Sequence, residues 1–165
     1  VEGRMATVDA GQAFSVIIDF AHTPDSFERL LKDLRKTTKG KLVVLFGSAG
    51  RRDEAKRAIQ GRIAGKYADE VVVTEEDDRD VDGNEIMNQI ASGVEESGKV
   101  REQNLFLILD RPSAIDFAVT RVHGPDDVLV LLGKGHEKTI ERADGEYPWD
   151  EAGEVRRALA NLAKN

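Results

Sequence analysis

Short apolar runs alternate along the chain with stretches in which apolar residues recur every three or four positions. Such runs, about five residues long, are typical of strands buried on both faces of a parallel sheet. Between them, the spacing is that of amphipathic helices. The sequence therefore predicts repeated strand–helix units, with strands over residues 14–19, 42–46, 70–74, 105–109 and 128–132.

The first helix begins at a clear signal. Thr23-Pro24-Asp25 combines an N-cap residue, a proline at the first helical position and an acidic first turn. A fourth helix is expected to begin near residue 110 and a last one to span residues 150–163. The positions expected to face the core are, helix by helix, Phe27, Leu30, Leu31 and Leu34; Ala55, Ile59 and Ile63; Ile86, Ile90 and Val94; Ile115, Val119 and Val122; and Val155, Leu159 and Leu162.

The pattern changes after the fifth strand. Residues 138–142 and 146–149 flank Ala143-Asp144-Gly145, which predicts a hairpin. The whole pattern predicts an α/β fold, a Rossmann-like three-layer sandwich. Its mostly parallel sheet has about six strands, and the hairpin supplies an antiparallel edge strand. We expect residues 1–10 to be an interdomain connection and residues 11–165 to be one domain.

The composition of the chain excludes several classes of function. The chain has 165 residues, 40% of them hydrophobic, and no apolar run approaches the roughly 20 residues that span a bilayer. With 31 acidic and 24 basic residues, the formal charge is −7, which opposes general binding to nucleic acid or anionic membranes. Cysteine is absent, which excludes disulfides and thiolate chemistry. We expect a cytoplasmic protein with no nucleic-acid or membrane partner.

Polar clusters follow four of the predicted strands directly. They occupy residues 19–25, 47–53, 75–79 and 133–137. The carboxyl ends of parallel strands share one edge of the sheet, and ligands bind in the crevice there. The four clusters therefore predict a single site.

Two clusters have a chemistry that suits a charged substrate. Glu137 could bind a substrate ammonium, and Lys134 or His136 could contact phosphate. Asp19 could accept hydrogen bonds from ribose hydroxyls, and His22 lies beside a helix N-terminus, where phosphate is favoured. The alternatives are an ordinary solvated loop for the first cluster and a capping and turn cluster for the second.

The other two clusters are rich in charge. Arg52 opens the second helix, where the helix dipole disfavours cations, so it points to an anionic partner. Lys56 and Arg57 could instead form an exposed basic face. An acidic stretch such as residues 75–80 is usually a solvated loop. Arg79 within it could bind a carboxylate through two guanidinium nitrogens.

Two common site types are excluded. A phosphate-binding P-loop needs a glycine five residues before Gly133 and a hydroxyl residue after Lys134, but those positions hold Val128 and Gly135. Histidine and carboxylate spacings of metal sites are also missing, so we expect no metal site in this chain.

The ordered motifs 19–25, 46–53 with Lys56-Arg57, and 133–137 resemble those of the C-terminal domain of the Mur ligases. The resemblance is greatest to the ligases that add the third residue of the peptidoglycan stem peptide. It implies an ATP-dependent enzyme of three domains that activates a carboxylate as an acyl phosphate, which the incoming amino group attacks. The partners implied are the protein's own N-terminal and central domains and UDP-muramoyl-dipeptide. ATP and Mg²⁺ would be bound mostly by the central domain, so this chain alone would be inactive and hold no catalytic residue.

The resemblance also implies residue roles. Arg52, Gly133 and Glu137 match residues that hold the amino acid's carboxylate and ammonium; Glu76, Asp77 and Arg79 match the motif that reads its side chain; Asp19 and His22 match the nucleotide-facing motif.

Several positions depart from the family pattern. Phe20 stands where tyrosine is usual, and Arg51 replaces an acid. The selectivity motif, usually Asp-Asn-Pro-Arg, here occupies residues 76–79 as Glu-Asp-Asp-Arg. Arg79 favours a distal carboxylate, whereas the three acids favour a distal ammonium such as that of lysine or ornithine. Diaminopimelate carries both groups, so the interpretation leans to it.

Two other functions fit the same pattern. A phosphoacceptor receiver domain has five strands with acids at their tips, but it needs an aspartate at the end of the third strand, where this chain has Thr74-Glu75. A non-catalytic binding module of the ligase fold is the other alternative.

Overall fold

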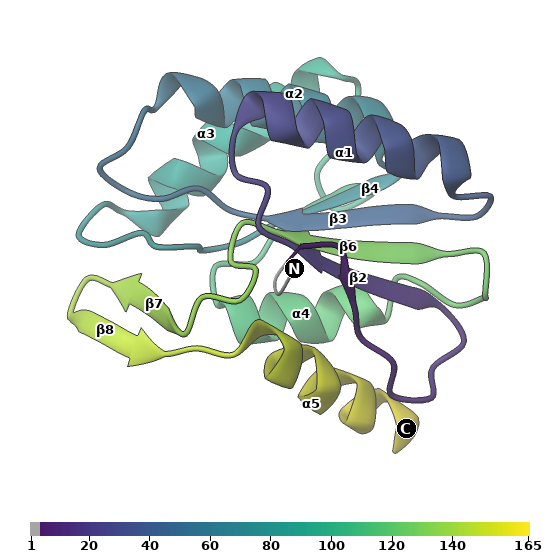
Figure 1. Cartoon of the computed structure of the whole chain (residues 1–165). Helices are drawn as coiled ribbons and strands as arrows, with labels where there is room; N and C mark the ends of the chain where they lie inside the picture. The colour runs from purple at the N-terminus through teal and green to yellow at the C-terminus, as the bar shows by residue number, and fades with distance from the viewer. Residues whose placement is uncertain (1–3) are drawn as a thin grey trace.

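A computed structural model describes residues 4–165, in which a six-stranded sheet forms the middle of three layers (Figure 1). Five parallel strands lie in the order β2-β6-β3-β4-β5, and β1 pairs antiparallel with β2 at the edge. The predicted fold class and all five predicted strands are confirmed. The strands are β1 (Ala6–Thr7), β2 (Ser15–Asp19), β3 (Leu42–Phe46), β4 (Glu70–Val73), β5 (Leu105–Leu107) and β6 (Val128–Leu132).

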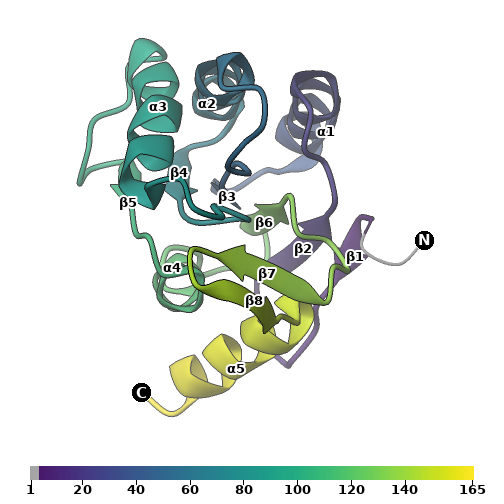
Figure 2. The same cartoon turned by 90° about the vertical axis from the view of Figure 1, so that its left-hand side faces the viewer.

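Helices cover both faces of the sheet. Three lie on one face, namely α1 (Pro24–Thr37), α2 (Ala55–Tyr67) and α3 (Gly83–Glu96), and two on the other, namely α4 (Arg111–Val119) and α5 (Glu151–Ala163) (Figure 2). Alternate strand residues enter the two cores: Val44 and Phe46 pack toward α1–α3, and Val43 and Leu45 toward α4 and α5. Within the described part of the chain, no helix is long and apolar enough to cross a bilayer.

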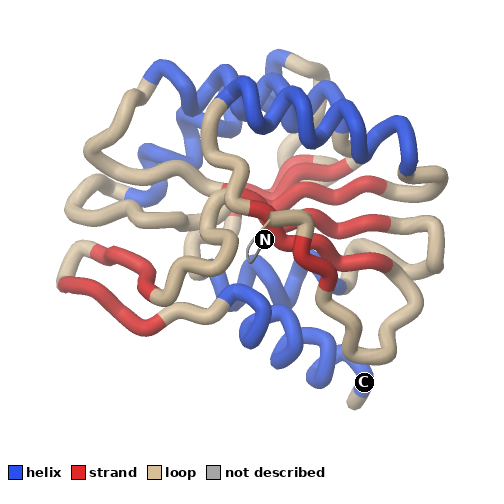
Figure 3. Tube along the Cα trace, in the orientation of Figure 1, coloured by secondary structure: helices blue, strands red, loops and turns tan. Residues whose placement is uncertain are grey.

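The hairpin formed as predicted, but its place was predicted wrongly. β7 (Thr139–Arg142) and β8 (Gly145–Pro148) pair antiparallel in a sheet of their own beyond the rim of the main sheet (Figure 3). Both sides of β2 are occupied, by β1 and β6, so no edge is open there. The antiparallel edge strand comes instead from Ala6–Thr7, within the expected interdomain connection; residues 1–3 of that connection lie outside the described residues.

The buried face of α2 also differs from the prediction. Ile59, expected in the core, is 39% exposed, and the buried side carries Gly61 and Gly65. A Cβ on Gly61 would lie 2.1 Å from the carbonyl oxygen of Ile90, and one on Gly93 only 1.9 Å from that of Ala58. The helices α2 and α3 therefore pack backbone to backbone, which requires glycine rather than a large apolar residue.

The carboxyl ends of the parallel strands meet at one rim, which faces the viewer in Figure 2. At this rim the segments after β2, β3 and β4 lead to α1, α2 and α3 on one face of the sheet (Figure 2). The segment after β6 leads to the hairpin and to α5 on the opposite face. Connections that part to opposite faces leave a crevice between them. The fold thus provides a groove where the sequence predicted a site.

Candidate functional site

The four polar clusters converge on one groove at this rim. The groove has a volume of about 360 Å³ and is open to solvent. Its lining comes from the segments after β2, β3, β4 and β6, and consists of Phe20, His22, Ala49, Arg52, Lys56, Glu76, Asp77, Arg79, Gly133 and Glu137. Seven of the ten residues singled out from the sequence therefore share one surface. The exceptions are Asp19, Lys134 and His136.

The start of α1 fixes the position of His22. Thr23 and Ser26 form a reciprocal capping box, and Pro24 occupies the first turn. The His22 ring Nδ1 lies 2.9 Å from the Phe20 carbonyl oxygen, which only accepts, so Nδ1 carries the proton. The other ring nitrogen, Nε2, remains for a ligand. Gln60 of α2 donates to the His22 carbonyl at 2.8 Å and ties this turn to the next cluster.

The segment after β3 packs tightly against the segment after β4. A Cβ on Gly50 would lie 2.0 Å from the Asp78 carbonyl oxygen, so a larger residue would push the two loops apart. Arg57, considered as part of a basic surface, is instead buried and donates to the Ala49 carbonyl at 3.1 Å. Arg52 is exposed and lines the groove, as does Lys56. Thus Arg57 supports the loop, and Arg52 and Lys56 give the groove its positive charge.

Glu76 is a buried carboxylate at the floor of the groove. Its side chain lies against Gly133, where a Cβ would be 2.0 Å from Glu76 Oε1. Burial, helped by the neighbouring Asp77 charge, raises the pKa of Glu76 to about 7. Burial likewise raises the pKa of Asp78 to about 6. No described residue donates a hydrogen bond to the Glu76 carboxylate, which leaves it ready for a ligand that brings a donor or a positive charge.

Lys134 is buried and does not line the groove, and its phosphate contact stays a prediction. Its side chain is fully buried, and its Nζ lies 2.9 Å from Asp77 Oδ1, 3.5 Å from Glu137 Oε1 and 2.6 Å from the Thr139 carbonyl oxygen. A buried ammonium needs such partners, and here they use its donors. Lys134 therefore fixes the groove residues Asp77 and Glu137.

Arg79 is held by a residue that the sequence analysis missed. Its Nε lies 2.6 Å from Glu141 Oε2 on β7, and its Nη1 donates to the Gly50 carbonyl at 2.7 Å. The Arg79 backbone has φ of 57° and its amide donates to the Glu141 carbonyl. No local signal could have revealed Glu141, because it meets Arg79 only once the hairpin docks on the segment after β4.

A buried ion-pair network supports the segment after β4 on the side of α4 and α5. Arg111 and Glu151 are both fully buried and pair at 2.7 Å. Arg111 also donates to the Glu75 backbone carbonyl, and both oxygens of the Glu75 carboxylate accept from Arg142 at 3.0 Å. The sequence analysis placed a helix start near residue 110 and did not identify this ion pair. The network joins α4, α5 and β7 to the residue next to Glu76.

Asp19 lies beside the groove, in a smaller pocket of about 210 Å³ that also contains His22. One of its oxygens accepts from the Met5 amide and the other from the Ala21 amide, each at 2.8 Å. The capping and turn alternative therefore describes its contacts here. Its nucleotide-facing role stays a prediction.

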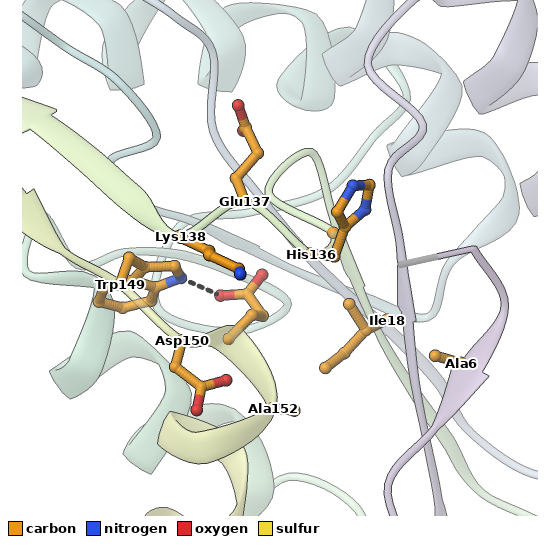
Figure 4. Close-up of a pocket in the computed structure, with 10 residues that line it drawn as sticks. Ala6, Ile18, His136, Glu137, Lys138, Trp149, Asp150 and Ala152 are labelled. Atoms are coloured by element: carbon orange, nitrogen blue, oxygen red, sulfur yellow. Dashed lines mark hydrogen bonds between the residues drawn. The ribbon is translucent and has the colours of Figure 1, made fainter. Parts of the chain in front are cut away.

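His136 lies in a third pocket, of about 470 Å³, on the α5 side of the rim. Figure 4 shows His136 at one side of this pocket, with Ile18 below it and Trp149 opposite. The Trp149 indole donates to the buried Glu151 carboxylate at 3.2 Å. A phosphate contact from His136 would therefore form outside the groove that contains Arg52.

Over residues 3–135 the chain matches the protein family described as Mur ligase, glutamate ligase domain. The chain belongs to the Mur ligase family and forms its C-terminal domain. A UDP-N-acetylmuramyl-tripeptide synthetase of Roseiflexus sp. (strain RS-1) is 48% identical over 98% of this chain, and one of Deinococcus radiodurans is 46% identical over 97%. Each alignment covers 32% of the relative.

A solved structure of a UDP-N-acetylmuramoyl-L-alanyl-D-glutamate–2,6-diaminopimelate ligase is similar over 99% of this chain and 32% of its own, with a TM-score of 0.85 and 31% identity. The chain thus spans about a third of the length of its relatives. Membership of the Mur ligases confirms the resemblance noted in the sequence. It also excludes the receiver alternative. A receiver needs an exposed aspartate at the end of the third predicted strand, where this chain has the buried Thr74-Glu75.

Proposed function

We propose that this Mur ligase domain serves an ATP-dependent ligase that adds the third residue to UDP-muramoyl-dipeptide in peptidoglycan synthesis. The observation that carries the proposal is the groove itself. It brings two cations, Arg52 and Lys56, and two carboxylates, Glu76 and Glu137, to one surface. A free amino acid is a zwitterion, and a groove that offers both signs of charge suits its two groups.

Within the groove, Arg52 binds the α-carboxylate of the incoming amino acid, and Glu137 binds its ammonium. Gly133 leaves room beside Glu76, so that the backbone and this carboxylate can approach the substrate. Glu76 and Asp77, with Arg79 at the edge, face the substrate side chain.

ATP supplies the activation of the substrate carboxylate as an acyl phosphate. The ammonium first loses one proton. The resulting amine attacks the acyl carbon, the C–N bond forms while the bond from that carbon to the phosphate oxygen breaks, phosphate leaves, and the nitrogen loses a second proton to give the amide. We assign contact with the nucleotide to His22 Nε2 and to the neighbouring pocket that contains Asp19. We assign Mg²⁺ and most of the ATP to the central domain, as the resemblance implies. We assign the reaction to the cytoplasm, where ATP is available.

The added residue is proposed to be a diamino acid. Similar proteins do not fix which one, since their names include both tripeptide synthetases and diaminopimelate ligases. The preference for diaminopimelate rested on an Arg79 available to a distal carboxylate. The pairing of Arg79 with Glu141 leaves Arg79 less available to such a carboxylate.

Ligation by the full-length protein tests the proposal. With UDP-muramoyl-dipeptide, ATP and a diamino acid, the wild type should release ADP and form the tripeptide. Arg52→Ala should raise KM for the amino acid by about tenfold or more, since a charged contact is lost. Arg62→Ala is the control, because Arg62 is an exposed residue of α2, the helix that follows Arg52, and it pairs with Glu96 outside the groove. Absence of ligation by the wild type would favour a non-catalytic binding module.

A further inference from the structure

The distal end of the groove has a charge balance that the selectivity motif alone does not reveal. Its one arginine, Arg79, pairs with Glu141 at 2.6 Å, and its acid Asp77 pairs with the buried Lys134 at 2.9 Å. These two pairs cancel in charge. Glu76 is left as the carboxylate without a cationic partner within hydrogen-bond reach among the described residues.

We propose that Glu141 is a specificity-determining residue: by neutralising Arg79 it makes the groove select an amino acid whose side chain ends in an ammonium group alone. The inference rests on the proposed function and identifies the class of its amino-acid substrate. A distal carboxylate, as in diaminopimelate, would meet Arg79 already beside the Glu141 carboxylate. A distal ammonium would instead meet Glu76, which forms no ion pair with any described residue.

The position of Glu141 is fixed by its backbone as well as its side chain. The Glu141 amide donates to Asp77 Oδ1 at 2.9 Å, and its carbonyl accepts from the Arg79 amide at 3.3 Å. Asp77 is itself held by Lys134. The docked hairpin therefore fixes the Glu141 carboxylate beside Arg79.

The guanidinium has little freedom to turn to a ligand. Its Nη1 donates to the Gly50 carbonyl at 2.7 Å, and its Nε lies 2.6 Å from Glu141 Oε2 in an ion pair without an aligned hydrogen bond, so two of its nitrogens have a partner. Arg79 is 26% exposed, and the pair is only partly screened by water. Breaking the pair to bind a substrate carboxylate would leave Glu141 beside that carboxylate, and like charges at such distances repel.

The test compares substrates in the full-length protein. We expect the wild type to use lysine or ornithine with a kcat/KM about tenfold or more above that for diaminopimelate. Glu141→Gln keeps the size and backbone contacts of the residue but removes its charge. It should raise the ratio of diaminopimelate to lysine kcat/KM by about tenfold. Because both substrates are measured in one preparation, partial unfolding of the variant cancels from the ratio.

Two variants complete the experiment. Glu141→Asp keeps the charge and should keep the preference for lysine. Glu146→Gln removes the same charge from the facing position of the same hairpin, where the structure has no pairing with Arg79, and should leave the ratio unchanged.

The possible results distinguish a failure of the role of Glu141 from a failure of the proposed ligase function. Diaminopimelate preferred by the wild type, or the same ratio in Glu141→Gln and Glu146→Gln, would overturn the role of Glu141 while leaving the ligase function standing. No ligation of any amino acid would overturn the proposed function, and this inference with it.

Discussion

Replacing the buried Glu76 with glutamine should stabilise this domain, although it removes a groove residue. Burial raises the pKa of Glu76 from 4.5 to about 7, because the folded protein disfavours its charged form. Between these two values the unfolded chain loses the proton while the folded chain keeps it. Stability therefore falls as the pH rises through this window, and the full loss is present above pH 7.

The size of the effect follows from the shift. One pKa unit corresponds to about 1.4 kcal/mol, so ionisation of Glu76 costs about 3 kcal/mol of unfolding free energy at pH 8. Glutamine is neutral and avoids this cost. Its buried amide finds no hydrogen-bond partner, however, which costs about 1 kcal/mol. Glu76→Gln should therefore gain about 2 kcal/mol at pH 8, a rise in Tm of roughly 4–8 °C, and should lose about 1 kcal/mol at pH 4, where only the cost of the amide remains.

Urea unfolding of the purified chain, followed by circular dichroism at pH 8 and pH 4, measures this difference. Glu75→Gln is the matched control, since the same change one residue earlier removes a carboxylate that accepts from Arg142 and from the Arg111 amide. It should destabilise the chain at pH 8 by about 1–3 kcal/mol. Equal gains for Glu76→Gln at both pH values, or a loss at pH 8, would refute the reasoning.

Three further predictions concern the same chain. Arg111→Ala should cost about 3–5 kcal/mol in urea unfolding, because it leaves the buried Glu151 unpaired; a cost under 1 kcal/mol would contradict the role of this pair. Gly93→Ala should cost about 2–4 kcal/mol in the same assay, whereas Gly124→Ala, whose Cβ meets nothing within 4 Å, should stay within about 1 kcal/mol. The isolated chain should show no ATP hydrolysis with UDP-muramoyl-dipeptide and only weak ATP binding by calorimetry; coupled turnover would show that the missing domains are dispensable.

Much of the framework could be predicted because it is encoded locally. The run of apolar residues over 42–46 is buried on both faces, as its continuity indicates. Thr23, Asp110 and Asp150 accept backbone hydrogen bonds as the N-caps of α1, α4 and α5. Strand ends follow from the same pattern, so the convergence of four clusters on one groove could also be predicted.

The second helix shows where pattern reasoning fails. Large apolar residues predicted its buried face, yet Ile59 is exposed and Gly61 lies at the contact with α3. Periodicity identifies buried faces by hydrophobic side chains, and it cannot detect an interface made by close backbone approach.

The sequence by itself determined the α/β order of elements, the rim on which the polar clusters gather, and the motifs that mark a Mur ligase domain. Only the tertiary structure decided which charges in the groove remain available to a ligand. Lys134 meets Asp77 across 57 positions of sequence, and Arg79 meets Glu141 only because the hairpin docks on the segment after β4. The reason is physical: helices and strands follow from neighbours a few residues apart, whereas the charge of a site depends on which distant side chains the fold brings within a few ångströms.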